Sequence, residues 1–273
     1  MSTKYIPNTS VEAEIMDPVP ITGYANLFLE AGETGNGLYM GSVNAGTSNI
    51  GAVFSVGLGG INGAFYNVLH KHTGQDTDRY KTIHNDIYQN AGMALSGFQD
   101  NFGPNDPVIF SMMLKPPVSY GMSHVDGVVF VDVFNPNQLP HGNPLNYAMI
   151  YVVPPLASNY TNNQDFLAHI EKTNLVIVSA INLYNSKYAY QGNTRGLEPI
   201  KDIYMCLFSG GYYRGSATVD QVALYNLRGL ESALSSAPTE ITKVYFENSY
   251  DKNVLPNQNV FRALKDMLAD SPS

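Results

Sequence analysis

Residues Val43–Gly74 read VNAGTSNIGAVFSVGLGGINGAFYNVLHKHTG, which has the order of a strand end, a glycine-rich loop and a helix start. Apolar residues end at Val43, polar Asn44 follows, and the loop then carries Gly57, Gly59, Gly60 and Gly63. Beyond the loop, apolar residues recur at helical spacing from Ile61 to Leu69. Glycine lets a backbone come close to a ligand, and the unpaired N–H groups of a helix N-terminus favour an anion. The stretch therefore predicts a site for a phosphate or a diphosphate.

The same composition also occurs in loops that only need tight turns and close packing, so this purely structural interpretation stays open beside the ligand-binding one. Two common phosphate-binding patterns are missing from the stretch. No Gly-Lys-Ser or Gly-Lys-Thr closes the loop, and the pattern G-x-G-x-x-G requires a glycine at position 62, where Asn62 stands.

A second stretch of the same kind lies at residues 203–234. The apolar run IYMCLF at 203–208 predicts a buried strand, SGGYYRG follows at 209–215, and apolar residues from Thr218 to Leu234 recur on one helical face. Thr218 and Gln221 fit a capping box at the start of that helix. Two anion-suited junctions between a strand and a helix on one sheet favour a shared ligand site.

Strand-like and helix-like segments alternate through most of the chain. Short β-branched and aromatic runs predict strands at 107–113, 125–134, 145–153 and 241–246, and helical spacing predicts helices at 163–184 and 260–268. We therefore expect a three-layer α/β/α domain with a mixed central sheet. Residues 1–20 are polar and proline-rich and predict an N-terminal arm or an added sheet edge; residues 21–273 form one domain in this interpretation, with insertions at 75–143.

The amino-acid composition limits which kinds of partner are expected. The net charge is -8 and only 15 of the 273 residues are Lys or Arg, so no nucleic-acid partner is expected, because phosphate neutralisation needs clustered cations. The six histidines are dispersed and show no metal-ligand spacing, so neither a metal nor a cofactor is expected. The single cysteine, Cys206, lies in an apolar run and is interpreted as a small core residue.

The N-terminus lacks an apolar signal core, and no apolar run approaches the roughly 20 residues of a membrane helix. We expect a cytoplasmic protein without a membrane segment. Secretion into a host cell without a standard signal peptide is the alternative.

The two glycine-rich stretches together resemble the macro domain, the ADP-ribose-binding α/β module. Its first motif, V-N-A-A-N followed by G-G-G-V-x-G-A-I, is similar to Val43, Asn44 and Ala45 and to GGINGAF at 59–65. Its second loop, S-T-G-V-Y-G, is similar to Ser209, Gly210, Gly211, Tyr212, Tyr213 and Gly215, with Arg214 as an extra residue. The strand at 147–154 and the closing segment at 244–268 follow in the family's order, so the resemblance spans roughly residues 38–268.

The resemblance implies binding of ADP-ribose, either free or attached to a protein. Asn44 would hydrogen-bond the distal ribose, and the first-loop backbone, including Val43, Ala45, Gly57, Gly59, Gly60 and Ile61, would lie under that ribose and the phosphates. Residues Ser209–Tyr213 would cover the diphosphate, and Phe246 would border the adenine. Glu30 or Glu33 would accept a hydrogen bond from the adenine amino group. Arg214 is interpreted as a partner for a phosphate or for an acid of a protein substrate.

Catalysis is a second question. Hydrolysis of an ADP-ribosyl linkage needs a positioned water and stabilisation of developing positive charge. Where one hydrolase branch of the family has Asp and His, this chain has Asn62 and Tyr66. The candidate catalytic set is therefore Asn44, Asn62, Asp76 and Asp78, the two aspartates being the nearest acids in sequence. Three functions stay open: an ADP-ribosyl hydrolase, a non-catalytic ADP-ribose reader, and a binder of another phosphorylated metabolite.

Overall fold

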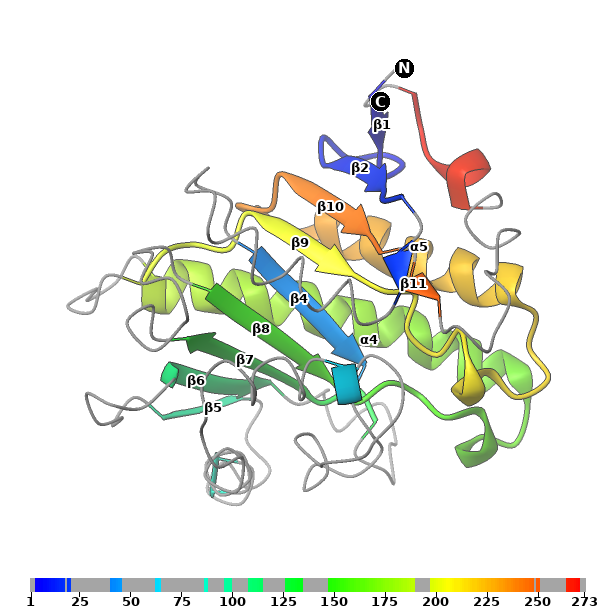
Figure 1. Ribbon diagram of the computed structural model, residues 1–273, viewed down its shortest axis with the longest axis horizontal. Coiled ribbons are helices and arrows are strands. Elements are labelled where there is room, and N and C mark those ends of the chain that lie inside the picture. The colour runs from blue at the N-terminus through cyan, green and yellow to red at the C-terminus, as the bar shows by residue number, and fades with distance from the viewer. Residues whose placement is uncertain are drawn as a thin grey trace.

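The computed structural model describes residues 3–17, 19–20, 40–45, 62–64, 86–87, 96–99, 108–114, 126–134, 147–189, 197–247, 249–250 and 264–270. Within these residues the fold is built on a nine-stranded sheet in the order β1-β2-β10-β9-β4-β8-β7-β6-β5 (Figure 1). The strands are β1 (Lys4–Tyr5), β2 (Glu12–Ile15), β4 (Met40–Ala45), β5 (Ser96–Gln99), β6 (Val108–Leu114), β7 (Val129–Phe134), β8 (Tyr147–Val152), β9 (Asp202–Met205) and β10 (Lys243–Phe246). Two further strands, β3 (Val19–Pro20) and β11 (Ser249–Tyr250), pair with each other in parallel.

The sheet is mixed, and the directions of its strands determine at which edge the connecting loops lie. Strands β2, β10, β9, β4 and β8 are parallel, whereas β1 and the series β7, β6 and β5 pair antiparallel. The carboxyl ends of β4, β8, β9 and β10 therefore lie along one edge of the sheet. In doubly wound sheets this is the edge at which ligands bind.

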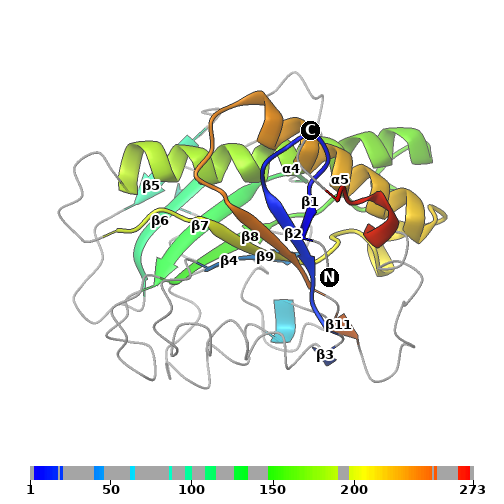
Figure 2. The same ribbon diagram turned by 90° about the horizontal axis from the view of Figure 1, so that it is seen from above.

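Two long helices cover one face of the sheet (Figure 2). Helix α4 (Asn163–Leu183) follows β8, and α5 (Val219–Ser236) follows β9. The side chain of Asn162 caps α4 by accepting from the Asp165 N–H, and Thr218 with Gln221 forms the expected capping box on α5. Helix α4 continues as a π-helical segment, η5 (Tyr184–Ala189), and short 3-10 helices η4 (Ala157–Asn159) and η6 (Tyr212–Arg214) lie in the two connections.

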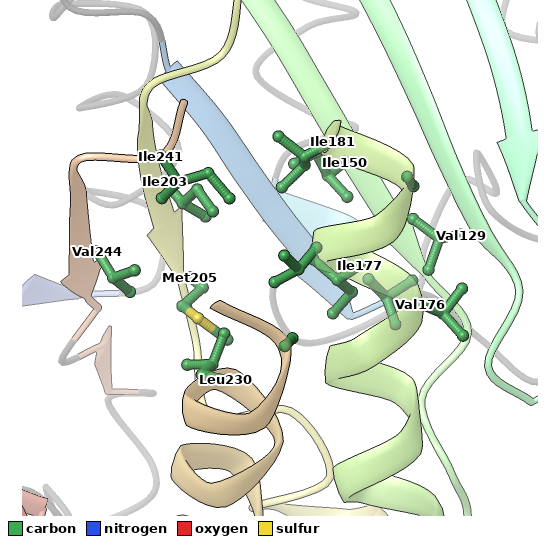
Figure 3. Packing of buried hydrophobic residues seen from close by; sticks show 14 of the residues in the cluster. Val129, Ile150, Val176, Ile177, Ile181, Ile203, Met205, Leu230, Ile241 and Val244 are labelled. Carbon is green, nitrogen blue, oxygen red and sulfur yellow. The ribbon is translucent and has the colours of Figure 1, made fainter. Parts of the chain in front are cut away.

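The hydrophobic core lies between the sheet and these helices (Figure 3). Ile177 and Ile181 of α4 pack toward Ile150 of β8, while Leu230 of α5 packs toward Met205 of β9, and all five side chains are fully buried. Burying a side chain of this size contributes about 1.5–3 kcal/mol. The alternation along β9, with Ile203 and Met205 facing the helices, thus anchors the strand directly before the second glycine-rich loop.

Helices α4 and α5 approach each other closely at a glycine. A Cβ added at Gly229 would lie 2.5 Å from the Glu171 carbonyl oxygen and 2.7 Å from the Asn174 Cβ. Next to this contact, the Asn174 amide donates to Asn226 Oδ1 at 3.2 Å. Asn226 in turn donates to the Phe208 carbonyl oxygen at 3.2 Å, so a buried amide pair links both helices to the end of the β9 segment.

The predicted α/β class with a mixed central sheet is confirmed. The strands at 107–113, 145–153, 203–208 and 241–246 and the helices at 163–184 and 218–234 all form, with ends shifted by a few residues. In the predicted segment 125–134 the strand begins only at Val129, because Asp126 and Gly127 form a turn in which Gly127 has a φ of 80°. Of the helix predicted at 260–268, the structure describes Leu264–Met267, which is helical.

The segment expected as an arm or an added edge contributes β1, β2 and β3. Val11 and Ala13 are buried in the core, and β2 pairs with β10. Tyr5 exchanges backbone hydrogen bonds with Ala269, at 2.9 and 3.0 Å. In the part of the chain that the structure describes, no helix is both long and apolar enough to cross a lipid bilayer.

Candidate functional site

The candidate site lies at the carboxyl end of β4, which has β8 on one side and β9 on the other. Asn44 and Ala45 end this strand opposite Tyr151 and Val152 of β8, and Val43 pairs with Met205 at the end of β9. The two glycine-rich stretches predicted to share a ligand thus follow neighbouring parallel strands. The sheet brings the starting points of both stretches together.

The helical segment Asn62–Ala64 lies on the sheet face opposite α4 and α5, beside the carboxyl end of β4 in both views (Figures 1 and 2). All three residues are buried, and Asn62 is 3% exposed. The other predicted residues of the first stretch, Gly57, Gly59, Gly60 and Ile61, lie outside the described residues, as do Tyr66, Asp76, Asp78, Glu30 and Glu33.

The loop after β9 begins with a serine in an unusual backbone conformation. Ser209 has a φ of 60°, in the left-handed region that favours glycine, and is 5% exposed. Its hydroxyl donates to the Pro155 carbonyl oxygen at 2.7 Å, and the Gly210 N–H donates to the Leu207 carbonyl oxygen at 3.2 Å. Residues held this way against their backbone preference cluster at ligand sites.

Two glycines of the loop have different environments. Gly215 has a φ of 59°, and a Cβ there would lie 2.7 Å from the Ala157 Cβ, so the turn and the close approach both require glycine. Gly211 is exposed, and an added Cβ would meet no atom of the described residues within 4 Å. The loop is therefore tightly packed at Gly215 and open at Gly211.

The connections after β8 and β9 contact each other although β4 lies between those strands. Besides the Ser209 to Pro155 bond and the Gly215 to Ala157 contact, Asn163 donates to Ser216 Oγ at 3.1 Å. Figure 1 shows both connections beyond the carboxyl ends of the strands. They form a bridge that fixes the β9 loop relative to the sheet.

A buried carboxylate supports the β8 side of this bridge. Asp126, fully buried before β7, accepts from the Tyr160 hydroxyl at 3.1 Å and from Asn159 Nδ2 at 3.4 Å. Burial, followed by the negative charge of Asp126, raises the pKa of the Tyr160 phenol far above its ordinary value, so Tyr160 stays a donor. Sequence reasoning missed this pair, because the two residues are 34 positions apart.

Tyr213 and Arg214 of η6 are half-buried, and the structure describes the backbone of Tyr212. Phe246 is fully buried in the core on the helix-covered face. On the opposite face of the sheet, the rings of Tyr204 of β9 and Tyr245 of β10 stack with their centroids 4.3 Å apart. Cys206 is buried, as expected. Among the described residues, no group of His, Cys, Asp and Glu could hold a metal ion.

Solved structures show the fold of this arrangement. The Oceanobacillus iheyensis macrodomain with MES bound aligns with a TM-score of 0.51 at 12% identity and covers 98% of this chain and 97% of that one. The Trypanosoma brucei macrodomain in complex with ADP-ribose aligns with a TM-score of 0.47 at 12% identity, covering 97% and 73%. The likeness to the Oceanobacillus iheyensis macrodomain shows that this chain has a macrodomain-like fold, as the resemblance predicted.

Comparison with related sequences assigns the chain to a more specific family than the predicted macro domain. DNA/RNA-binding protein ALBA4 of Plasmodium falciparum (isolate 3D7) is 30% identical over 233 residues, and Mitochondrial association factor 1 form a1 of Toxoplasma gondii (strain ATCC 50611 / Me49) is 29% identical over 109. These matches cover 79% and 40% of this chain but 58% and 23% of the relatives, so the chain spans little more than half the length of ALBA4. The family model of the Mitochondrial association factor 1 C-terminal domain matches residues 99–256, more than half of the 273 residues. The chain belongs to this family.

Proposed function

We propose that this chain binds ADP-ribose, free or attached to a protein, at the carboxyl ends of β4 and β9. One observation carries the proposal: the strands that lead into the two motifs, β4 and β9, are adjacent and parallel, and they pair through Val43 and Met205. The macrodomain-like fold supports it independently of the motifs, since that likeness rests on the whole chain.

In this proposal Asn44 contacts the distal ribose, and Val43, Ala45 and the glycines of the first loop lie under the sugar and phosphates. Ser209, Gly210 and Gly211 cover the diphosphate with their backbone. The conformation at Ser209 and the bond to Pro155 would hold the loop ready before the ligand arrives, which lowers the entropy lost on binding. Phe246 is left out of the ligand contacts, because its ring is fully buried in the core.

Titration calorimetry with ADP-ribose tests the proposal, with AMP, NAD and ribose 5-phosphate as competitors. Gly211→Val is the informative variant, because a Cβ at this exposed position would meet no described atom within 4 Å. We expect it to abolish binding while leaving the melting temperature within about 2 °C of the wild type. The matched control is Ser232→Ala on the exposed face of α5, which should bind normally.

Absence of ADP-ribose binding by the folded wild-type chain would refute the proposal. Tighter binding of another phosphorylated metabolite would instead favour the third function considered from the sequence.

Hydrolysis of an ADP-ribosyl linkage is the second function we propose to test, favoured by the buried helical segment Asn62–Ala64, which lies beside the carboxyl end of β4. In this role Asn44 and Asn62 would position the attacking water, and Asp76 or Asp78 would supply the carboxylate. Incubation with mono-ADP-ribosylated protein measures release of ADP-ribose. Binding without release at high protein concentration would leave a reader as the function.

A further inference from the structure

Arg214 stands out among the cations of the described residues. It lies in η6, inside the β9 loop, and its side chain is half-buried. Its Nε is buried and has no hydrogen-bond partner, and the guanidinium forms no ion pair with any described residue. An arginine has five N–H donors, and burying one of them without a partner destabilises the fold.

Three other cations of the described chain have clear partners. Lys4 pairs with Asp270 at 2.6 Å, Lys243 pairs with Glu14 at 2.7 Å, and Arg228 lies over the Tyr225 ring at 5.3 Å. The chain has 23 acidic residues and 15 basic ones, so acidic side chains outnumber the basic side chains that they could pair with. A buried donor without a partner among the described residues can donate to a ligand or a water.

The backbone around Arg214 is held on both sides. The Arg214 N–H donates to the Gly211 carbonyl oxygen, and the Arg214 carbonyl oxygen accepts from the Ala217 N–H, each at 3.2 Å. Gly215, packed on Ala157, fixes the next residue. The backbone position of Arg214 is therefore set by the fold, and the open Gly211 lies three residues before it in the same loop.

We propose that Arg214 binds a phosphate oxygen of the ligand and so makes affinity depend on the ligand's negative charge. This inference rests on the proposed nucleotide site and adds to it a residue that the macrodomain loop pattern lacks, since Arg214 is the extra residue in that comparison. The planar guanidinium matches a phosphate better than an ammonium does, because it donates two parallel hydrogen bonds.

The test compares Arg214→Gln, Arg214→Lys and Arg228→Ala with the wild type. ADP-ribose and inorganic pyrophosphate are the charged probes, and adenosine is the neutral one. We expect Arg214→Gln to weaken ADP-ribose binding about 10-fold to 100-fold, which is the usual effect of losing a hydrogen bond to a charged group. Arg214→Lys should lose less, Arg228→Ala nothing, and the weak adenosine affinity should be equal in all four proteins.

Two further readouts separate ligand binding from a structural role. The ligand-free melting temperature of Arg214→Gln should equal or exceed that of the wild type, because the replaced group has no partner to lose. The salt dependence of ADP-ribose binding should be shallower in Arg214→Gln, because one ion contact is gone.

Each outcome decides something different. If the wild type binds neither ADP-ribose nor pyrophosphate, the proposed function fails together with this inference. If the wild type binds ADP-ribose and Arg214→Gln binds equally well, only the assignment of Arg214 fails. A ligand-free Arg214→Gln that melts several degrees lower would show a structural role and overturn the assignment.

Discussion

Ser209 offers a sharp test of the loop that follows β9, because two effects act at one residue. Its φ of 60° is unfavourable for a side chain, and its hydroxyl donates to the Pro155 carbonyl oxygen at 2.7 Å. Ser209→Ala removes the hydrogen bond and keeps the unfavourable conformation. Ser209→Gly removes the same hydrogen bond but relieves the conformation.

The magnitudes follow from these two terms. Losing the bond while the buried Pro155 oxygen stays unsatisfied costs about 1–3 kcal/mol, so Ser209→Ala should be destabilised by about 2 kcal/mol. Left-handed backbone costs about 1–2 kcal/mol for a residue with a Cβ. Glycine regains that cost but loses about 0.4–1 kcal/mol through the entropy of the unfolded chain. Ser209→Gly should therefore be more stable than Ser209→Ala by about 0.5–1 kcal/mol.

Urea unfolding followed by circular dichroism measures both variants, and Ser232→Ala on α5 serves as the exposed serine control. In a thermal scan, 1 kcal/mol corresponds to about 2–4 °C for a chain of this size. A Ser209→Gly protein no more stable than Ser209→Ala would contradict the left-handed conformation. A Ser209→Ala protein as stable as the wild type would show that the bond to Pro155 contributes nothing.

The other predictions concern the helix pair, an acid and the partners. Gly229→Ala should destabilise the fold by about 1–3 kcal/mol in urea unfolding. Overpacking against the Glu171 carbonyl oxygen outweighs the higher helix propensity of alanine, which is worth about 1 kcal/mol. An unchanged urea midpoint would contradict the close contact between α4 and α5. Burial raises the pKa of Asp202, although the Thr242 hydroxyl and Lys243 lower it. The folded state therefore binds the Asp202 proton more tightly than the unfolded state, and the stability of the wild type relative to Asp202→Asn should rise from pH 7 toward pH 4. A difference in stability that does not change with pH would argue against this. We predict no nucleic-acid binding tighter than about 100 µM at physiological salt, measured by mobility shift with duplex DNA and single-stranded RNA. A shift at micromolar protein would mean that the activity in the name of ALBA4 extends to this region.

The local sequence pattern was sufficient to predict those helices and strands whose apolar periodicity agrees with their burial in the fold. In α5, the capping box at Thr218 and the apolar face through Leu230 predicted both the helix start and the buried side. The strand β7 was predicted from its β-branched and aromatic residues, which occupy five of its six buried positions. In each case the residues that make the element also specify its place in the core.

Other features depend on contacts between distant residues and could not be read from a local pattern. Asp126 and Tyr160 become partners only because β7 begins where β8 ends. Asn226 is an amide on an apolar helix face, a signal of a buried partner, but its link to Phe208 depends on how α5 packs. Phe246 was assigned to the ligand from its place in a motif, and the alternation along β10 instead turns its ring into the core.

The edge strands have a consequence for the order of folding. Strand β2, at residues 12–15, completes its pairing with β10, at residues 243–246, and Lys4 meets Asp270 across 266 positions of sequence. Closing so long a loop has an entropic cost that is repaid only once both ends are present. During synthesis β1 and β2 can pair with each other, but they must wait for β10 until almost the whole domain has left the ribosome, while β8, α4 and β9 can already assemble. We therefore expect the edge formed by β1 and β2, at the top of Figure 1, to form last and to open first.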